Sequence, residues 1–218
     1  MRRIVVRTTA AAFALLASAT AAEAQSFPKF SLLAGTGWLG ESRLGNVPNE
    51  LGGVSEARHH TTGNYVLGLE TASPLKGVDL RLSFEYARPK LQLMRPPEMP
   101  DQIYRTSVKT LTLDAVVRGP RVLDAQLYGI VGAGVRHFDF KQVYFHDSNF
   151  PAYEKDQLVP VAHLGAGVRW NVGRYDLFVE AGGHLGRFEE DPGVPAGMRG
   201  EVDRGTLGVT VGFRVPLN

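Results

Sequence analysis

The sequence alternates between apolar and polar or glycine residues over strand-length segments from residue 30 onward. The clearest case is the segment from Thr206 to Val215, in which every odd position is apolar and every even position is polar or glycine. A period of two is typical of a β-strand with one apolar face. Because the opposite face of such segments carries charges and glycines, the apolar face is predicted to be the outside of a membrane-spanning barrel.

Eight segments share this alternation, and no segment shows an apolar stripe of helical period. They span residues 30–39, 64–71, 80–86, 106–117, 126–138, 159–170, 175–188 and 206–215. Between them, long connectors rich in proline, glycine and charge alternate with short ones; the long ones are 40–62, 87–105, 139–158 and 189–203. Outer-membrane barrels have long loops at one end, short turns at the other and an even number of strands, whereas a Greek-key sandwich has no reason to alternate so regularly. The sequence therefore predicts an all-β fold, an eight-stranded antiparallel up-and-down transmembrane β-barrel, in preference to a soluble barrel.

Residues 1–24 are predicted to be a cleaved Sec signal peptide, which leaves residues 25–218 as an outer-membrane β-barrel domain. Basic residues precede an apolar segment that is too short for a transmembrane helix, and Ala22-Glu23-Ala24 fits an A-x-A cleavage site. Without the three arginines and one glutamate of this peptide, the 24 basic and 22 acidic residues become equal in number. The charge therefore does not indicate nucleic-acid binding. Cysteine is absent, so no thiol-based metal or redox site is present.

Aromatic side chains near the strand ends share the outward parity. They are expected to form two girdles at the headgroup levels of a bilayer, where aromatic rings are enriched. The residues are Phe30, Trp170, Tyr175 and Phe213 near the end with short turns, and Trp38, Tyr65 and Tyr86 near the other end. A general preference of aromatic residues for strands accounts for their presence but not for this placement.

The inward parity collects most of the charges of the strands. These residues are Glu70, Arg81, Glu85, Asp114, Arg136, Arg169, Asp176, Glu180, His184 and Arg214. Buried charges persist when they are paired and hydrogen-bonded, and the interior of an eight-stranded barrel is just wide enough for side chains. Many glycines share the inward parity, which leaves room for the long charged side chains. The sequence predicts a structural charge network that plugs the lumen, with a small, narrow channel as an alternative.

The terminal strand carries the most specific local pattern: a polar residue, a glycine, a hydrophobic and an aromatic residue at Thr206, Gly208, Val211 and Phe213. With the barrel pattern over residues 25–218, the chain resembles the small outer-membrane β-barrel proteins of the OmpA/OmpX type, although residues 214–218 follow the aromatic that usually ends this pattern. The resemblance implies a cell outer membrane location, contact with outer-membrane lipid and lipopolysaccharide, and recognition by the barrel assembly machinery. It also implies no cofactor and a structural or surface-interaction role, in which a ligand would bind the long loops.

The strongest catalytic candidate is the string His146-Asp147-Ser148-Asn149, with Glu154 nearby. It is similar to a string in the outer-membrane lipid A deacylases, in which His, Ser and Glu act as base, nucleophile and orienting group. In that family the string lies near the C-terminal strand, but here it lies mid-chain, so a non-catalytic polar loop is favoured over a lipid A-modifying hydrolase. His59-His60 with Glu56 has no further ligand at metal-binding spacing, so no metal site is predicted.

Overall fold

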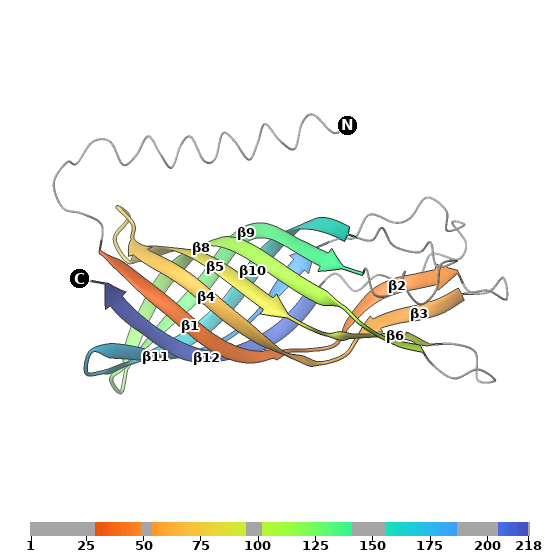
Figure 1. Ribbon diagram of the computed structural model, residues 1–218. Coiled ribbons are helices and arrows are strands. Elements are labelled where there is room, and N and C mark those ends of the chain that lie inside the picture. Colours follow the sequence, from red (N-terminus) through yellow and green to blue (C-terminus); the bar gives the residue numbers. More distant parts are fainter. Residues whose placement is uncertain (1–28, 49–53, 95–101, 141–155, 187–204, 218) are drawn as a thin grey trace, which may run out of the picture.

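Eight antiparallel strands close into a barrel, which confirms the predicted fold class (Figure 1). The computed structural model describes residues 29–48, 54–94, 102–140, 156–186 and 205–217. The barrel strands are β1 (Phe30–Leu39), β4 (Thr62–Ala72), β5 (Val78–Ala87), β8 (Ser107–Val122), β9 (Ala125–Asp139), β10 (Asp156–Val172), β11 (Tyr175–Gly186) and β12 (Gly205–Leu217). Each pairs with the barrel strands next to it in the chain, and β1 pairs with β12 to close the ring. The described residues contain no helix that is long and apolar enough to cross a membrane.

Alternation along the strands separates an apolar outer face from a polar inner one, as β5 illustrates. Leu82 and Phe84 are 47% and 41% exposed on the outside, whereas Arg81 and Glu85 on the inside are 3% and 8% exposed. Successive side chains of a strand point to opposite faces, so this pattern follows directly from the sequence. A one-residue shift in register would place both charges on the outer face, and the outer leucines would enter the lumen.

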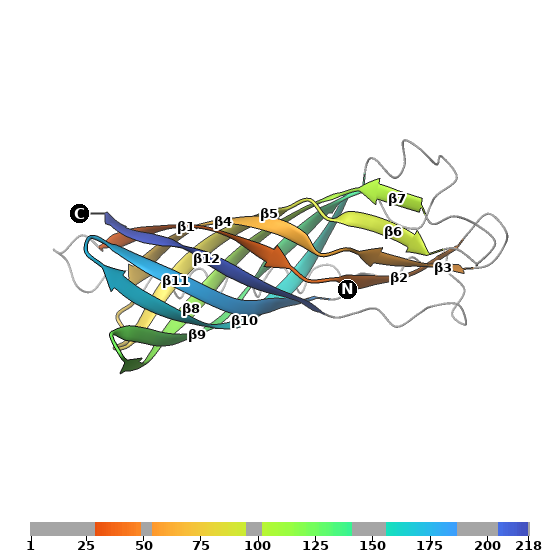
Figure 2. The ribbon, with the colours of Figure 1, turned by 90° about the horizontal axis from the view of Figure 1, so that it is seen from below.

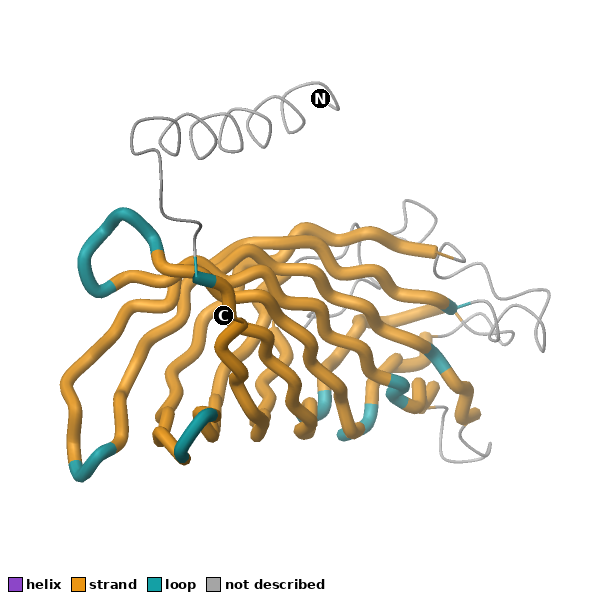
Figure 3. Tube along the Cα trace, turned by 60° about the vertical axis from the view of Figure 1, so that its left-hand side comes forward, coloured by secondary structure: helices purple, strands orange, loops and turns teal. Residues whose placement is uncertain are grey.

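One end of the barrel carries short turns together with the start of β1 and the end of β12, and we refer to it as the turn end (Figures 1 and 3). β8 and β9 are joined there by Leu123 and Asp124, which have φ angles of 47° and 65°. Positive φ at both central residues is the requirement of a type I′ hairpin turn, and leucine is an unusual residue to meet it. Gly173, with φ of 68°, supports the turn between β10 and β11 in the usual way.

At the opposite end, the loop end, part of the barrel wall continues as a second sheet (Figure 2). It consists of β2 (Ser42–Pro48), β3 (Val54–His59), β6 (Lys90–Met94) and β7 (Gln102–Arg105), in the order β2-β3-β6-β7. These strands directly follow or precede β1, β4, β5 and β8, which are neighbours in the same order. The interpretation of residues 40–62 and 87–105 as plain loops is therefore wrong. Their strands are short and rich in charge, so their alternation is hard to separate from a polar loop.

An apolar cluster lies between one face of this second sheet, which we call the projecting sheet, and the barrel strands β8, β9 and β10. One face of the sheet contributes Leu44, Ala57, Leu91, Leu93 and Tyr104, and inward positions of β8, β9 and β10 contribute Val108, Phe138 and Val159, with Phe140 following β9. All are less than a tenth exposed. The strands of the projecting sheet thus pack against barrel strands from later in the chain, through an apolar cluster that the sequence pattern did not predict.

Candidate functional site

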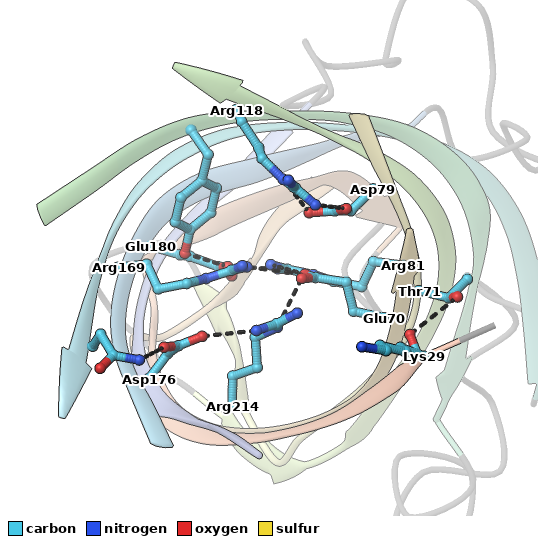
Figure 4. A network of polar contacts seen from close by, with 12 residues as sticks. Lys29, Glu70, Thr71, Asp79, Arg81, Arg118, Arg169, Asp176, Glu180 and Arg214 are labelled. Carbon is cyan, nitrogen blue, oxygen red and sulfur yellow. Dashed lines mark hydrogen bonds and ion pairs between the residues drawn. The ribbon is translucent and has the colours of Figure 1, made fainter. Parts of the chain in front are cut away.

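The lumen is the main polar site of the molecule, and Glu70 lies at its centre in the half nearer the turn end (Figure 4). The Glu70 side chain from β4 is fully buried. Arg81 donates to Glu70 Oε2 from Nε and Nη2 at 3.0 and 2.9 Å, and Arg169 Nη2 donates to the same oxygen at 3.0 Å. Arg214 Nε lies 2.9 Å from Glu70 Oε1 in an ion pair without hydrogen-bond alignment. One carboxylate therefore joins β4 to β5, β10 and β12.

Two further carboxylates complete this group, which we call the Glu70 cluster: Glu70, Arg81, Tyr128, Arg169, Asp176, Glu180 and Arg214. Glu180 accepts from Arg81 Nη1 at 2.5 Å and from the Tyr128 hydroxyl at 2.8 Å. Asp176 accepts from Arg214 Nη1 at 2.7 Å. The Tyr128 ring lies 5.0 Å from the Arg169 guanidinium carbon, within cation–π range. Three arginines face three carboxylates, so each buried charge is compensated.

A second polar group, nearer the loop end, contains two stacked histidines. The His163 and His184 rings are 4.5 Å apart and nearly parallel. His163 Nδ1 lies 2.9 Å from Asp114 Oδ1, and His184 Nε2 lies 3.7 Å from Glu85. The result is an Asp–His–His–Glu row across the lumen. A cavity of about 60 Å³ separates this row from the Glu70 cluster, with Arg81, Glu85 and both histidines among its lining residues. This is room for a few water molecules but not for a continuous pore.

Arg136 has a different environment from the other lumen arginines. It is 4% exposed, and among the described residues it donates only to the hydroxyl groups of Thr110 and Thr206, at 2.9 and 3.1 Å. Its Nη2 atom has no hydrogen-bond partner in this part of the chain. The ten charged residues expected inside the barrel thus divide between the Glu70 cluster, the histidine row and this isolated arginine.

Glycines make space for the polar side chains at two places of very close approach. A Cβ atom on Gly167 would lie 2.4 Å from the Tyr128 ring, and one on Gly132 would lie 2.0 Å from Asp114 Oδ1. Neither distance is possible for real atoms, so any larger residue would displace a member of the lumen groups. These glycines alternate with outward apolar residues and thereby belong to the same two-residue pattern.

Sequence reasoning missed several lumen residues. Arg118 Nε donates to Asp79 Oδ2 at 2.9 Å, but both residues fall in segments interpreted as turns. Their strands extend further than predicted, and β8 contains a bulge between Arg118 and Arg121 that the alternation does not reveal. Tyr128 and His163 also have the inward parity; Tyr128 carries no charge, and the predicted set omits His163 although it includes His184, a residue of the same type.

The aromatic residues at the strand ends lie on the outside of the barrel. The exposed fractions of Trp38, Tyr65 and Phe213 are 60%, 67% and 56%. Phe30, Trp170 and Tyr175 are 36%, 38% and 50% exposed near the turn end, and Tyr86 is half-buried beneath Arg88. Rings in such positions are available to bilayer headgroups.

The remaining candidates from the sequence do not form a site in the part of the chain that the structure describes. His146, Ser148 and Glu154 lie outside the described residues. His59 is buried in the projecting sheet, where Thr106 Oγ1 lies 3.1 Å from its Nε2, whereas His60 faces solvent. Burial, followed by the nearby Arg136, lowers the pKa of His59 to about 3. The described residues hold no group of three potential metal ligands.

Comparison with known proteins supports the architecture through a solved structure. No protein-family model matches the chain, and no curated protein does. Among solved structures, Neisserial surface protein A is similar over 85% of this chain and 96% of its own, with 10% identity and a TM-score of 0.51. The fold is that of an outer-membrane β-barrel. Ail, the attachment invasion locus protein of Yersinia pestis, aligns over 86% of this chain and 99% of its own (13% identity, TM-score 0.44). The outer membrane protease OmpT of Escherichia coli aligns over 89% and 99% (7% identity, TM-score 0.45).

The outer face of this barrel is apolar over the height of the strands. Leu67, Leu111 and Val131, on three different strands, are 55%, 44% and 50% exposed, and similar residues surround the barrel. A closed sheet satisfies every backbone hydrogen bond internally, which allows it to cross a bilayer. The barrel is therefore a transmembrane one, with its apolar outer face in contact with the hydrocarbon of the bilayer.

Proposed function

We propose that this protein is a sealed outer-membrane barrel with a structural or surface-interaction role, and that its loop end faces the outside of the cell. Support for the seal comes from the lumen, where the Glu70 cluster, the histidine row and the apolar cluster follow one another along the barrel axis. Ion pairs join Arg81 to Glu70 and Glu180 in the first layer, the two histidine rings stack in the second, and buried apolar side chains pack together in the third. A sealed barrel would serve as a membrane anchor, and the projecting sheet is the surface that it would anchor.

The proposal includes removal of residues 1–24 as a signal peptide, and contact of the folded chain with the assembly machinery through β12. It also includes contact with outer-membrane lipid and lipopolysaccharide around the apolar face. Orientation follows from the connectors, because outer-membrane barrels keep their short turns in the periplasm. The four-stranded sheet then stands above the membrane, where a ligand can reach it.

Conductance tests the seal. The purified barrel in planar lipid bilayers is expected to produce no stepwise current, because the lumen cavity of about 60 Å³ is bordered by the ion pairs of the Glu70 cluster and by the stacked histidines. A double variant, Tyr128→Ala with Arg169→Ala, removes two large side chains from the Glu70 cluster and is the comparison in which leakage is expected. Stepwise conductance by the wild-type protein would establish the channel alternative instead.

Orientation can be tested cleanly because the chain contains no cysteine. Ile103 is 59% exposed on the projecting sheet, and Leu75 is 69% exposed in a turn at the other end. A membrane-impermeant maleimide added to intact cells should label Ile103→Cys and not Leu75→Cys, and both should be labelled after cell lysis. Labelling of Leu75→Cys alone in intact cells would reverse the proposed orientation.

A further inference from the structure

Four basic residues form a continuous strip on the outward face where β5 and β8 leave the barrel and continue as β6 and β7. They are Arg88, Lys90, Arg105 and Lys109, which we call the basic strip. All four are exposed. Lys109 is opposite Tyr86, and Lys90 is opposite Arg105. The Thr106 amide donates to the Pro89 carbonyl at 3.2 Å, so the two strands stay paired between these positions. From Tyr86 to Lys90 the strip is about 13 Å long, at roughly 3.3 Å per residue.

The basic strip is not neutralised within the described residues. None of its members forms an ion pair there, and Arg88 instead donates from Nε to the Tyr86 hydroxyl. Like charges directly opposite each other destabilise a sheet, so the Lys90–Arg105 pair has an energetic cost. Elsewhere on the same sheet this cost is avoided: Arg43 and Arg58 are also directly opposite, and both bind Glu56.

The strip begins where the apolar outer face ends. Below it, β5 presents Leu82 and Phe84 and β8 presents Leu111, all exposed to the bilayer. Tyr86 marks the boundary, and its ring lies 5.6 Å from the Arg88 guanidinium carbon. A molecule bound to this side of the barrel would therefore contact apolar side chains at the level of Leu111 and basic side chains directly beyond them, toward the loop end. Among the described acidic groups, Asp139 of β9 flanks the strip, opposite Ser107, which lies between Arg105 and Lys109, and Glu41 lies beyond β3, next to His60.

We infer that the basic strip binds the phosphorylated sugar headgroup of a glycolipid in the surrounding outer leaflet, whose acyl chains cover the apolar face below. This inference rests on the proposed orientation, with the loop end outside. Charge and position together favour this occupant. A soluble anion would contact the basic side chains but not the adjoining apolar surface, whereas a membrane glycolipid with phosphate groups would contact both.

Lipid binding by the full chain, folded in detergent micelles, provides the test. Native mass spectrometry would count bound lipid A that carries two phosphates, and lipid A stripped of phosphate at the same concentration. The variant Lys90→Gln/Arg105→Gln removes two cations from the strip. Lys76→Gln/Arg121→Gln removes two exposed cations at the turn end and is the matched control. Heat-modifiable gel mobility verifies that each variant is folded.

The strip variant is expected to bind phosphorylated lipid A roughly thirtyfold more weakly than wild type, at about fivefold per basic residue near a lipid surface. The control should match wild type, and an equal concentration of inorganic phosphate should not displace the lipid. Equal binding of the dephosphorylated lipid, or equal losses in both double variants, would overturn the inference. Displacement by inorganic phosphate would assign the strip to soluble anions and overturn the lipid assignment. These outcomes are separate from conductance and maleimide labelling, which test the proposed function.

Discussion

Replacing Glu70 with glutamine would test whether the Glu70 cluster holds the barrel together. The substitution keeps the shape of the side chain but removes the charge that Arg81, Arg169 and Arg214 share. The cluster changes from three cations and three anions to three cations and two anions in a nearly dry space. Removing one partner from a buried ion pair costs about 3–5 kcal/mol, because the remaining charge loses its compensation. We expect Glu70→Gln to lower the free energy of unfolding by that amount.

Urea unfolding in detergent micelles at pH 7, followed by gel mobility of unheated samples, measures this free energy. Glu56→Gln is the matched control, because Glu56 also binds two arginines, but Arg43 and Arg58 are 43% and 36% exposed. Its effect should stay below about 1 kcal/mol. Adding Arg169→Gln to Glu70→Gln should recover part of the loss by restoring charge balance. Equal effects of Glu70→Gln and Glu56→Gln would refute the central role of Glu70.

Four further predictions concern single positions. A Cβ on Gly134 would lie 1.9 Å from the Leu111 carbonyl oxygen, so Gly134→Ala should destabilise the barrel by about 1–3 kcal/mol in the same urea assay. Leu123→Asn should stabilise it by about 0.5–1 kcal/mol, because asparagine adopts positive φ more easily. His59, with its pKa lowered to about 3, stays neutral when folded and takes up a proton when exposed, so the stability of the projecting sheet should fall as the pH drops below about 6.5. Limited proteolysis between pH 7 and 5 should show this, and His59→Asn should weaken the dependence. Ser148→Ala should leave the lipid A acylation pattern unchanged by mass spectrometry; a changed pattern would establish the hydrolase alternative.

The barrel could be predicted from the sequence because one face of each strand contacts lipid and the other face contacts a polar lumen. Leu82 and Phe84 face lipid while Arg81 and Glu85 face a polar lumen, so the chemical contrast between successive residues is as large as it can be. Such a contrast shows that the segment is a strand and also which of its residues face outward. For β1, the predicted bounds and the observed ones coincide.

The projecting sheet could not be predicted, because its contrast is weaker and its strands are short. In β3, the inward residues are Ala57 and His59, and neither is strongly apolar. His59 falls in a segment that the sequence pattern indicated to be a polar loop, but it is a buried, neutral side chain whose ring lies 6.0 Å from the Phe138 ring. The ion-pair partners within the lumen could not be predicted either. The alternation shows that Glu70 and Arg169 point inward, but not that they meet across the barrel.

The shared strand order of the barrel wall and the projecting sheet limits how the outer part of this chain can change in length. One residue inserted between Leu39 and Arg43 would exchange the faces of β2, so that Leu44 would turn to solvent and Arg43 would enter the apolar cluster. Within the described segments from β1 to β8, insertions and deletions at the loop end would be tolerated between β2 and β3 or between β6 and β7, and not next to the barrel. From β1 to β8, variation in length among homologous chains should therefore fall at these two connections, while the segments that link the barrel strands to the projecting sheet keep a constant number of residues.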